Sequence, residues 1–377
     1  MTDGVTAELL SKVSEIPAEQ WDALNPRGNP FVSHAFLSAL EHSGSVGPGT
    51  GWSPAPLLVR DADGVPAAAL PAYLKSHSQG EYVFDHHWAD AFHRAGGQYY
   101  PKLQIAAPFS PVPGPRLLVR DLAMAVPILR AAEAVVEQNG LSSAHATFVD
   151  ETELAQFRAA GWLTRVGAQF HWQNRDYADF EAFLGALSSR KRKAIRKERA
   201  GAQSAARTEQ ISGADITSEH WDAFWIFYQD TGTRKWGTPY LTRAFFDIIG
   251  DTMRDSIVLF LAFSGDRPIA GALNFVGPDC LYGRYWGCTR EVPFLHFELC
   301  YYKAIDYAIA HGLARVEAGA QGEHKLARGY EAVPTYSAHY IANEGFRIAV
   351  ADFLERETQA MEREIEFLGH MAPFKKG

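Results

Sequence analysis

The residues best suited to chemistry lie between Tyr282 and His339, late in the 377-residue chain. The stretch EAGAQGEHKLARGYEAVPTYSAHYI, from Glu317 to Ile341, mixes acids, histidines, cations, tyrosines and glycines directly after an apolar strand pattern. Side chains of these types transfer protons near neutral pH and hold anionic groups. We therefore expect a functional site in this part of the chain.

The pattern YGRYWG predicts an aromatic strand at the start of this region. Because successive strand residues point to opposite faces, Tyr282, Arg284 and Trp286 are expected on one face. An arginine between two aromatic rings suits an anionic or planar ligand, and the alternative is a half-buried arginine stacked for stability. His296 and Glu298 follow in LHFELC. Both face the cleft if they precede the helix, whereas a plain interaction of Glu298 with the helix dipole is the alternative.

The segment GAQGEHKLARGY follows a predicted strand and is rich in glycine. Gly319 and Gly322, which flank Gln321, permit a positive φ or a close backbone approach. Lys325 and Arg328 are three residues apart and share a face if a helical turn forms. A strand-to-helix turn of this kind with nearby cations binds phosphate or carboxylate, although the Walker A pattern is absent.

Candidate proton-transfer groups are Glu323, His324 and His339, which also raise the alternative of a metal site with Glu317. The spacings H-E-x-x-H and C-x-x-C are absent, and the histidines are spread out. We therefore expect no metal here.

A second polar cluster occurs in the first half, in FDHHWADAFHRAGGQYYPKLQ. Its histidines and its aspartate suggest a metal, but their spacing is not diagnostic. We interpret the segment as a substrate-side wall, with a plain structural loop as the alternative. The metal-type residues are Asp85, His86, His87 and His93, and the wall residues are Trp88, Tyr99, Tyr100 and Lys102.

The predicted elements repeat along the chain and indicate an α/β (α+β) fold in two domains. The pattern of each half predicts, in this order, two helices, a hairpin, a third strand, a long helix, a strand and a closing helix and strand. The hairpin turns RDADGVPAAAL and SGDRPIAGAL match in position and character. We expect an N-terminal domain in 1–175 and a C-terminal domain in 176–377.

A basic linker helix is expected at 188–200, between the two halves. Seven of the ten residues in 190–199 are basic, and Glu198 is the one acid there. Ser188 or Ser189 is a candidate N-cap. The helix either grips the phosphates of a nucleic acid or of a polyphosphate ligand, or it is a solvated, charged linker.

The overall charge and the cysteines limit the possible classes. The net charge is −8, so a bulk nucleic-acid binder is excluded and any such contact is local. The three cysteines lack metal spacing and fit a reducing compartment. We see no signal-peptide pattern and no apolar run of the roughly 20 residues that a membrane span needs. We expect a cytoplasmic protein without a membrane span.

The segments LYGRYWGC, LHFELCYYKAIDYAI and EAGAQGEHKLARGY, followed by YSAHYI, resemble the FemAB-like N-acyltransferases, bacterial proteins of the GNAT superfamily. The resemblance extends over nearly the whole chain. It implies two tandem GNAT-type folds with mixed, largely antiparallel sheets flanked by helices. Fem-type transferases pass an aminoacyl group from aminoacyl-tRNA to a peptidoglycan-precursor amine, and LSSRKRKAIRKERAGA is similar to their basic segment.

The resemblance implies an N-acyltransferase whose acceptor is an amine of a small molecule or a peptidoglycan-related compound. The usual GNAT pyrophosphate loop is missing, and CTREVPFLH stands in its place. The acyl donor therefore stays open among acyl-CoA, an acyl carrier and aminoacyl-tRNA, the last bound through 190–199.

Acyl transfer to an amine needs a general base and donors that stabilise an oxyanion. Glu298, Glu323 and His324 are the candidate bases, and Tyr282 and Tyr336 are candidates for the oxyanion or the leaving group. The alternatives are a non-catalytic ligand-binding protein of the same fold and a metal-dependent hydrolase. The expected binding residues are Tyr282, Arg284, Trp286, His296, Gly319, Gln321, Gly322, Lys325, Arg328 and His339.

Overall fold

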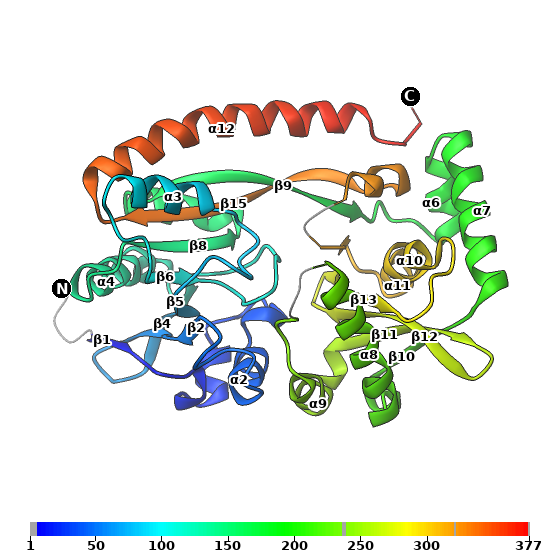
Figure 1. Ribbon diagram of the computed structural model, residues 1–377, viewed down its shortest axis with the longest axis horizontal. Coiled ribbons are helices and arrows are strands. Elements are labelled where there is room, and N and C mark those ends of the chain that lie inside the picture. Colours follow the sequence, from blue (N-terminus) through cyan, green and yellow to red (C-terminus); the bar gives the residue numbers. More distant parts are fainter. Residues whose placement is uncertain (1–5, 236–238, 320–321, 376–377) are drawn as a thin grey trace. The chain divides into compact units, whose positions relative to one another are not determined.

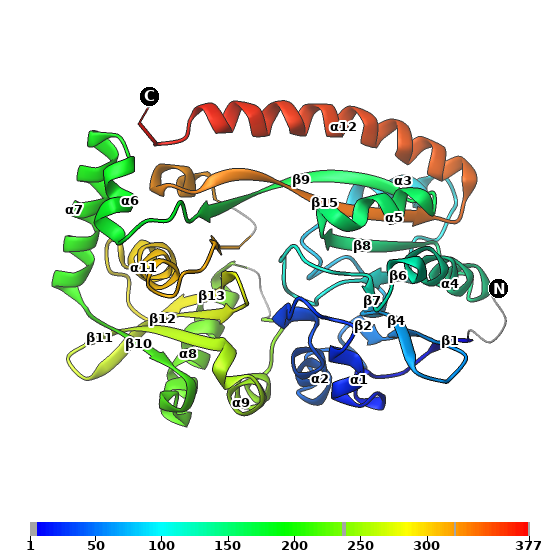
Figure 2. The same ribbon diagram turned by 180° about the vertical axis from the view of Figure 1, so that it is seen from behind.

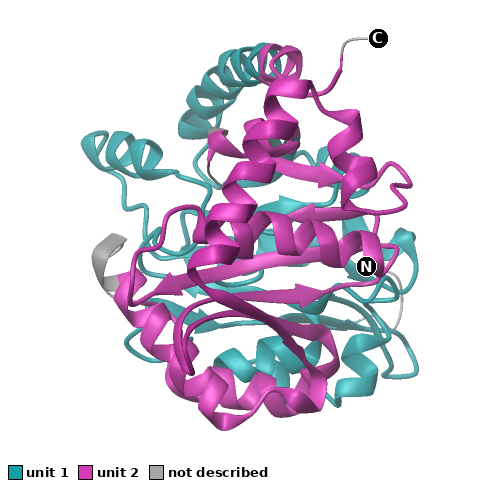
Figure 3. Cartoon of the chain, turned by 90° about the vertical axis from the view of Figure 1, so that its right-hand side faces the viewer, with its two compact units in different colours: residues 1–167, 334–364 teal, residues 168–333, 365–377 magenta. Residues whose placement is uncertain are grey.

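The computed structural model describes residues 6–235, 239–319 and 322–375. The chain forms two compact units (Figure 3): unit 1 holds residues 1–167 and 334–364, and unit 2 holds residues 168–333 and 365–377. A single division after residue 175, as expected from the sequence, does not describe this arrangement. The reason is that strand β15, Glu331–Ile341, pairs over Tyr336–Ile341 with a strand of unit 1.

Unit 1 contains most of the first half of the chain (Figure 1). Two elements, β9 and α12, begin in unit 1 and end in unit 2. The strands are β1 Thr6–Leu9, β2 Trp52–Pro54, β3 Leu57–Arg60, β4 Pro66–Leu70, β5 Ala72–Lys75, β6 Lys102–Ile105, β7 Leu118–Val119, β8 Ser143–Val149 and β9 Leu163–Gln173, and the helices are α1 Ala18–Asp22, α2 His34–His42, α3 His86–Arg94, α4 Ala125–Gln138, α5 Leu154–Ala159 and α12 Glu344–His370.

The strands of unit 1 lie in the orders β1-β3-β4-β7 and β15-β8-β6-β5-β2. The expected hairpin is present as β3 and β4, with Asp61 accepting from the backbone N–H groups of Asp63 and Val65 in the turn. Strands β6 and β8 are parallel, and helix α4 connects them as a crossover. The apolar core of this unit includes Ile128 and Leu129 of α4, which are fully buried.

Unit 2 contains residues 282–333, most of the region in which the sequence predicts the site; its helices and strands are labelled in Figures 1 and 2. A short 3₁₀ helix, Glu323–Arg328, follows its last short strand. The strands are β10 Arg207–Ser212, β11 Ile257–Ser264, β12 Arg267–Val276, β13 Cys280–Cys288 and β14 Arg315–Glu317, and the helical segments are α6 Phe180–Ala186, α7 Ser189–Ala205, α8 Ser218–Lys235, α9 Arg243–Thr252, α10 Leu295–Phe297, a π-helix at Glu298–Tyr302 and α11 Lys303–Ala310.

The strands of unit 2 lie in the order β10-β11-β12-β13-β14-β9. Strands β13 and β14 are parallel, but they pair only over Cys280–Tyr282 and Arg315–Glu317. Helix α8 covers one face of the sheet, and α11 covers the other, as both views show (Figures 1 and 2). The order of hairpin, third strand, helix and parallel strand thus occurs in both units, as the repeated pattern predicts.

A β-bulge interrupts β13 and changes which side chains share a face. Gly283 pairs with Asn274 and Tyr285 pairs with Leu273, so Arg284 is the extra residue. Leu281, before the bulge, and Trp286, after it, pack in the same apolar cluster as α11. Because neighbouring strand residues alternate, Tyr282 points away from that face. The expectation that Tyr282 and Trp286 share a face is therefore wrong.

The half of β13 after the bulge lies directly against α8. Tyr285 contacts the ring of Tyr228 at 5.4 Å between centroids. A Cβ on Gly287 would overlap the backbone oxygen of Phe227, so this position has no room for a side chain. Among the described residues, every helix is too short or too polar to cross a lipid bilayer.

We expect Gly287→Ala to lower the free energy of unfolding by about 3 kcal/mol, because the added methyl group forces α8 and β13 apart. Gly185→Ala in α6 is the matched control, since a Cβ there meets nothing within 4 Å. It should raise stability slightly, because alanine has the higher helix propensity. Urea denaturation of both variants measures the effect, and equal stabilities would contradict the close approach.

Candidate functional site

A cluster of aromatic and histidine rings lies in unit 2, where the sequence predicts the site. The ring of His296 lies 5.2 Å from Trp286, 5.3 Å from Tyr301 and 6.3 Å from His324, between centroids. The Tyr301 hydroxyl and Nε2 of His324 are 2.8 Å apart and share a hydrogen bond. Trp286, His296 and His324, three of the residues predicted from the sequence, therefore lie together.

The π-helix at Glu298–Tyr302 sets the position of Tyr301 in this cluster. The wider turn brings residues five apart onto one side, so Tyr301 contacts His296. Tyr301 is 3% exposed, and burial raises its pKa. The phenol therefore stays protonated near neutral pH. His324, in contrast, is exposed to solvent.

A pocket of about 540 Å³ borders the ring cluster. Trp286 and His296 belong to both the cluster and the pocket wall, and Arg290 and Glu291 place charged groups at the pocket. Its lining residues all belong to unit 2. They are Thr231, Trp286, Cys288, Arg290, Glu291, Val292, Pro293, Leu295 and His296.

The segment around Gly319 and Gly322 adopts the backbone geometry that glycine permits. Their φ angles are 80° and 121°. A Cβ on Gly322 would lie 2.6 Å from the His324 ring, so this glycine makes room for the histidine. Gln321 lies outside the described residues. Glu323 starts the 3₁₀ helix, and its side chain is likewise outside the description.

Lys325 points inward, although we expect it to hold an anionic group. It is 1% exposed, and its Nζ donates to the carbonyl oxygen of Gly319 at 2.7 Å. Burial lowers its pKa from the ordinary 10.5 to about 7, and the charge of Arg284 acts in the same direction. The ammonium therefore loses its proton near neutral pH, whereas a lysine that binds phosphate has to keep its positive charge.

Arg328 is also engaged within the protein rather than open to a ligand. Its guanidinium donates to both carboxylate oxygens of Glu198 and lies 3.4 Å from the ring centre of Phe297. The Tyr302 hydroxyl donates to the same carboxylate. Arg328 thus ties the 3₁₀ helix to α7, which explains the single acid among the basic residues of that helix.

Glu298 does not have the environment of a general base. It is fully buried, and its carboxylate accepts from Arg199 at 3.0 and 3.1 Å and from Gln203 at 2.9 Å. The guanidinium and the amide already occupy the carboxylate oxygens, and burial closes them to an incoming amine. We therefore do not retain Glu298 as a base.

Two of the predicted site residues belong to unit 1 instead of unit 2. The Tyr336 hydroxyl donates to Glu151 at 3.2 Å. His339 is 2% exposed, and its Nδ1 lies 2.8 Å from Nδ1 of His145. Both expectations rest on closeness in sequence to Arg328, whereas pairing of β15 with β8 places these residues in the other unit.

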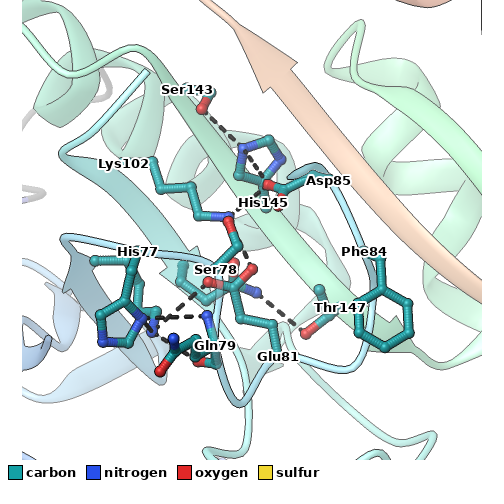
Figure 4. A network of polar contacts seen from close by, with 12 residues as sticks. His77, Ser78, Gln79, Glu81, Phe84, Asp85, Lys102, Ser143, His145 and Thr147 are labelled. Carbon is teal, nitrogen blue, oxygen red and sulfur yellow. Dashed lines mark hydrogen bonds and ion pairs between the residues drawn. The ribbon is translucent and has the colours of Figure 1, made fainter. Parts of the chain in front are cut away.

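Unit 1 contains a buried polar network next to this histidine pair (Figure 4). Lys102 Nζ donates to Ser78 at 2.9 Å, to Glu81 at 2.7 Å and to Asp85 at 2.5 Å. Asp85 also accepts from the Tyr99 hydroxyl at 2.6 Å. Lys102 is fully buried, so these residues are a core network and not the substrate wall that we expect.

Two buried lysines and two buried carboxylates provide the charged groups of this network. Burial opposes the charge on Lys102, but the carboxylates of Glu81 and Asp85 outweigh it and raise its pKa. Burial lowers the pKa of His145 to about 3 and also lowers that of His339. Both histidines are therefore neutral near pH 7, and the positive charge of the network comes from Lys102 and from Lys75, whose Nζ lies 3.7 Å from Glu81.

The expected N-cap of α7 and the metal alternative can each be compared with the structure. Ser188 occupies the N-cap position of α7, but its side chain makes no capping hydrogen bond.

In the described part of the chain, no three His, Cys, Asp or Glu side chains gather as a metal-binding group. Binding of phosphate groups by residues 190–199 stays a prediction.

Phe297 and Tyr301, and the contact of Glu198 with Arg328, are not among the residues and contacts that the sequence predicts. Tyr301 lies four residues after Phe297, and their rings stack 6.0 Å apart. An i, i+4 aromatic pair beside a histidine is a signal that could have identified it. The partnership of Glu198 with Arg328 joins segments 130 residues apart, and no local pattern predicts it.

We expect Lys102→Met to lower the free energy of unfolding by about 3–5 kcal/mol, because it removes the buried cation that Glu81 and Asp85 share and leaves Glu81 only Lys75, whose Nζ is 3.7 Å away. Arg27→Met is the control, since Arg27 pairs with Asp150 at the surface and should contribute about 0–1 kcal/mol. Chemical denaturation at neutral pH separates the two, and equal losses would contradict the role of the network.

Lys325→Met should alter how stability depends on pH. Between pH 7 and 10.5 the unfolded chain holds a proton on Lys325 that the folded chain has released, so wild-type stability rises with pH across this window. The variant loses this rise, and its stability relative to the wild type should fall as pH increases. Urea denaturation across the window measures it. A constant difference would refute the lowered pKa, and Lys197→Met, which changes an exposed side chain, serves as the control.

Comparison with known proteins adds a family and a fold. The family model FemAB-like, described as peptidoglycan biosynthesis/recognition, matches residues 12–376. Among curated proteins, none matches the chain.

Solved structures match over most of the chain at low sequence identity. FemX is 13% identical, covers 89% of this chain and 98% of its own, and has a TM-score of 0.54. L-PGS from Bacillus licheniformis is 10% identical, with coverages of 90% and 97% and a TM-score of 0.53. The C-terminal domain of a putative lysylphosphatidylglycerol synthetase from Agrobacterium fabrum is 11% identical, with coverages of 90% and 95% and a TM-score of 0.53. These likenesses show a fold that is shared over most of the chain. The family match over nearly the entire chain shows that this protein belongs to the FemAB-like family.

Proposed function

We propose that the protein is a transferase that passes an acyl or aminoacyl group to an amine of a small-molecule or peptidoglycan-related acceptor. The observation that carries this proposal is the hydrogen bond between His324 and Tyr301 in a ring cluster that borders a pocket. Membership of a family described as peptidoglycan biosynthesis/recognition supports the acceptor class. The likeness to FemX supports the fold on which such a site is built.

In this proposal His324 is the general base. When its Nε2–H donates to the Tyr301 oxygen, Nδ1 carries the lone pair and can accept a proton from the attacking amine. The amine nitrogen then bonds to the acyl carbon, and the bond from that carbon to the leaving group breaks. Tyr301 fixes the ring orientation, and Gly322 leaves space for it. His324 is exposed, so the incoming amine can reach it.

The pocket supplies the binding surface for one of the two reactants. Trp286 and His296 offer ring surfaces, and Arg290 offers a positive charge for an anionic group. The loop of this wall is CTREVPFLH, which the sequence shows in place of a glycine-rich pyrophosphate loop. The donor therefore stays open among acyl-CoA, an acyl carrier and aminoacyl-tRNA. A phosphate contact through 190–199 and a cytoplasmic location stay predictions.

Two other functions are compatible with parts of the same description. A non-catalytic protein could use the pocket to bind an amine or a peptidoglycan fragment, in which case ligands raise the melting temperature without any transfer. A metal-dependent hydrolase needs a ligand set, and the described residues contain no such cluster. The hydrogen-bonded His324 favours the transferase, because it is poised for proton transfer.

His324→Ala should lower transfer by about 10²–10⁴-fold, the range that general bases contribute. The purified protein is incubated with acyl-CoA, acyl carrier or aminoacyl-tRNA and with a peptidoglycan precursor that has a free amine. Mass spectrometry then measures the gain in acceptor mass. Tyr301→Phe should lower transfer less, because it removes only the partner that orients the ring.

The controls are a surface histidine and a surface tyrosine in comparable settings. His311, which stacks on Tyr307, and Tyr340, which donates to Glu137, should be replaceable by Ala and Phe without loss of transfer. Wild-type turnover by His324→Ala would refute the assigned base. No transfer with any donor class, together with ligand-induced stabilisation, would support the binding protein instead.

A further inference from the structure

One face of α7 carries exposed cations that the fold does not use. Arg190, Lys193 and Lys197 are exposed and lie at i, i+3 and i+7, which places them on one side of the helix. The opposite side holds the buried Ile195 and Ala202. Among the described residues, no carboxylate lies within ion-pair distance of these three cations.

Helix stability does not explain cations at this position. The first turn of α7 has no acidic residue, although the N-terminal end of a helix dipole favours negative charge. Arg190 and Lys193 therefore oppose the dipole of their own helix. Their charge is more readily explained by an external anionic partner.

Exposed apolar side chains lie in the last turn of helix α12 and directly after it. Phe367 is 63% exposed and Met371 is 51% exposed, and they are one helical turn apart. Leu368, between them in sequence, is 6% exposed and packs into the apolar core of unit 2. The core thus takes up one side of this turn and leaves Phe367 and Met371 in water.

Backbone hydrogen bonds join the residues that follow α12 to the end of α6 and to the N-cap of α7. Ser188 N–H donates to Pro373 at 2.9 Å, and Lys375 N–H donates to Ala186 at 3.0 Å. The two segments lie side by side in both opposite views (Figures 1 and 2). Lys375, which is exposed, adds a further cation here. The exposed cations and the exposed apolar residues therefore belong to neighbouring segments of one unit.

We propose that Arg190, Lys193 and Lys197 of α7 act together with Phe367 and Met371 of the adjoining segment as one basic–apolar surface, which docks on an anionic lipid bilayer. Cations attract anionic headgroups, and adjacent apolar side chains gain by entering the boundary between headgroups and acyl chains. An RNA backbone accounts for the cations but leaves Phe367 and Met371 in water. The whole chain has a charge of −8, so attraction to such a surface has to come from a local patch of this kind.

The test uses the full chain and sedimentation with vesicles. Vesicles of phosphatidylcholine mixed with phosphatidylglycerol should retain the protein, and vesicles of phosphatidylcholine alone should not. Lys193→Glu with Lys197→Glu should weaken binding by at least roughly fivefold for each cation removed. Phe367→Ser with Met371→Ser should also weaken it, and binding should decrease as salt screens the headgroups.

Matched variants control for charge and for apolar surface. Arg254→Glu with Arg267→Glu makes the same charge change at exposed positions of unit 2, and Ile226→Ser with Leu122→Ser removes other exposed apolar groups. These controls should bind as the wild type does, and equal melting temperatures confirm folding of all variants. Failure to bind anionic vesicles, full binding by the Phe367 and Met371 variant, or selective binding of tRNA with no vesicle binding would each overturn the proposal. The test is independent of acyl transfer, so loss of one proposal leaves the other standing.

Discussion

The bulge at Arg284 determines the arrangement of the candidate site. Without it, strand alternation would direct Trp286 away from Leu281 and toward α8. With it, Trp286 meets His296 and forms a wall of the pocket, while Gly287 allows α8 to approach the strand. One extra residue in β13 therefore fixes both the position of the pocket wall and the packing of the opposite helix.

The charged groups near the pocket fall into two kinds. Lys325, Arg328 and Glu298 have partners inside the protein, and they hold the 3₁₀ helix and the π-helix in place. Arg290 and His324 are exposed to solvent. The first kind gives rigid support, whereas Arg290, which donates to Ser264 at 3.1 Å, and His324, which shares a hydrogen bond with Tyr301, keep part of their surface in solvent.

The sequence predicts the parts of this fold that depend on local patterns. The hairpin turns, the aromatic strand and the helix that ends before Gly312 all follow from residue order. Trp286, His296 and His324, which the sequence assigns to one region, lie beside one another in the structure. The bulge and the π-helix are not predictable, because each is one additional residue in a pattern that is otherwise regular.

Long-range partners account for the remaining errors. Tyr336 and His339 follow Arg328 closely in sequence, yet the register of β15 against β8 assigns them to unit 1. Lys102 is of a residue type that often binds ligands. Here its ion pairs with Glu81 and Asp85 hold it in the core. Such outcomes depend on which distant segments meet, and residue types alone carry no information about that.

The π-helix at Glu298–Tyr302 makes the position of Tyr301 sensitive to the deletion of a single residue. It holds one more residue than an α-helix of the same span, so deletion of a single residue there would restore regular α geometry. The ring of Tyr301 would then rotate by roughly 100° about the helix axis and leave His324. A paralogue with such a deletion would keep the fold and the pocket while losing the aligned histidine.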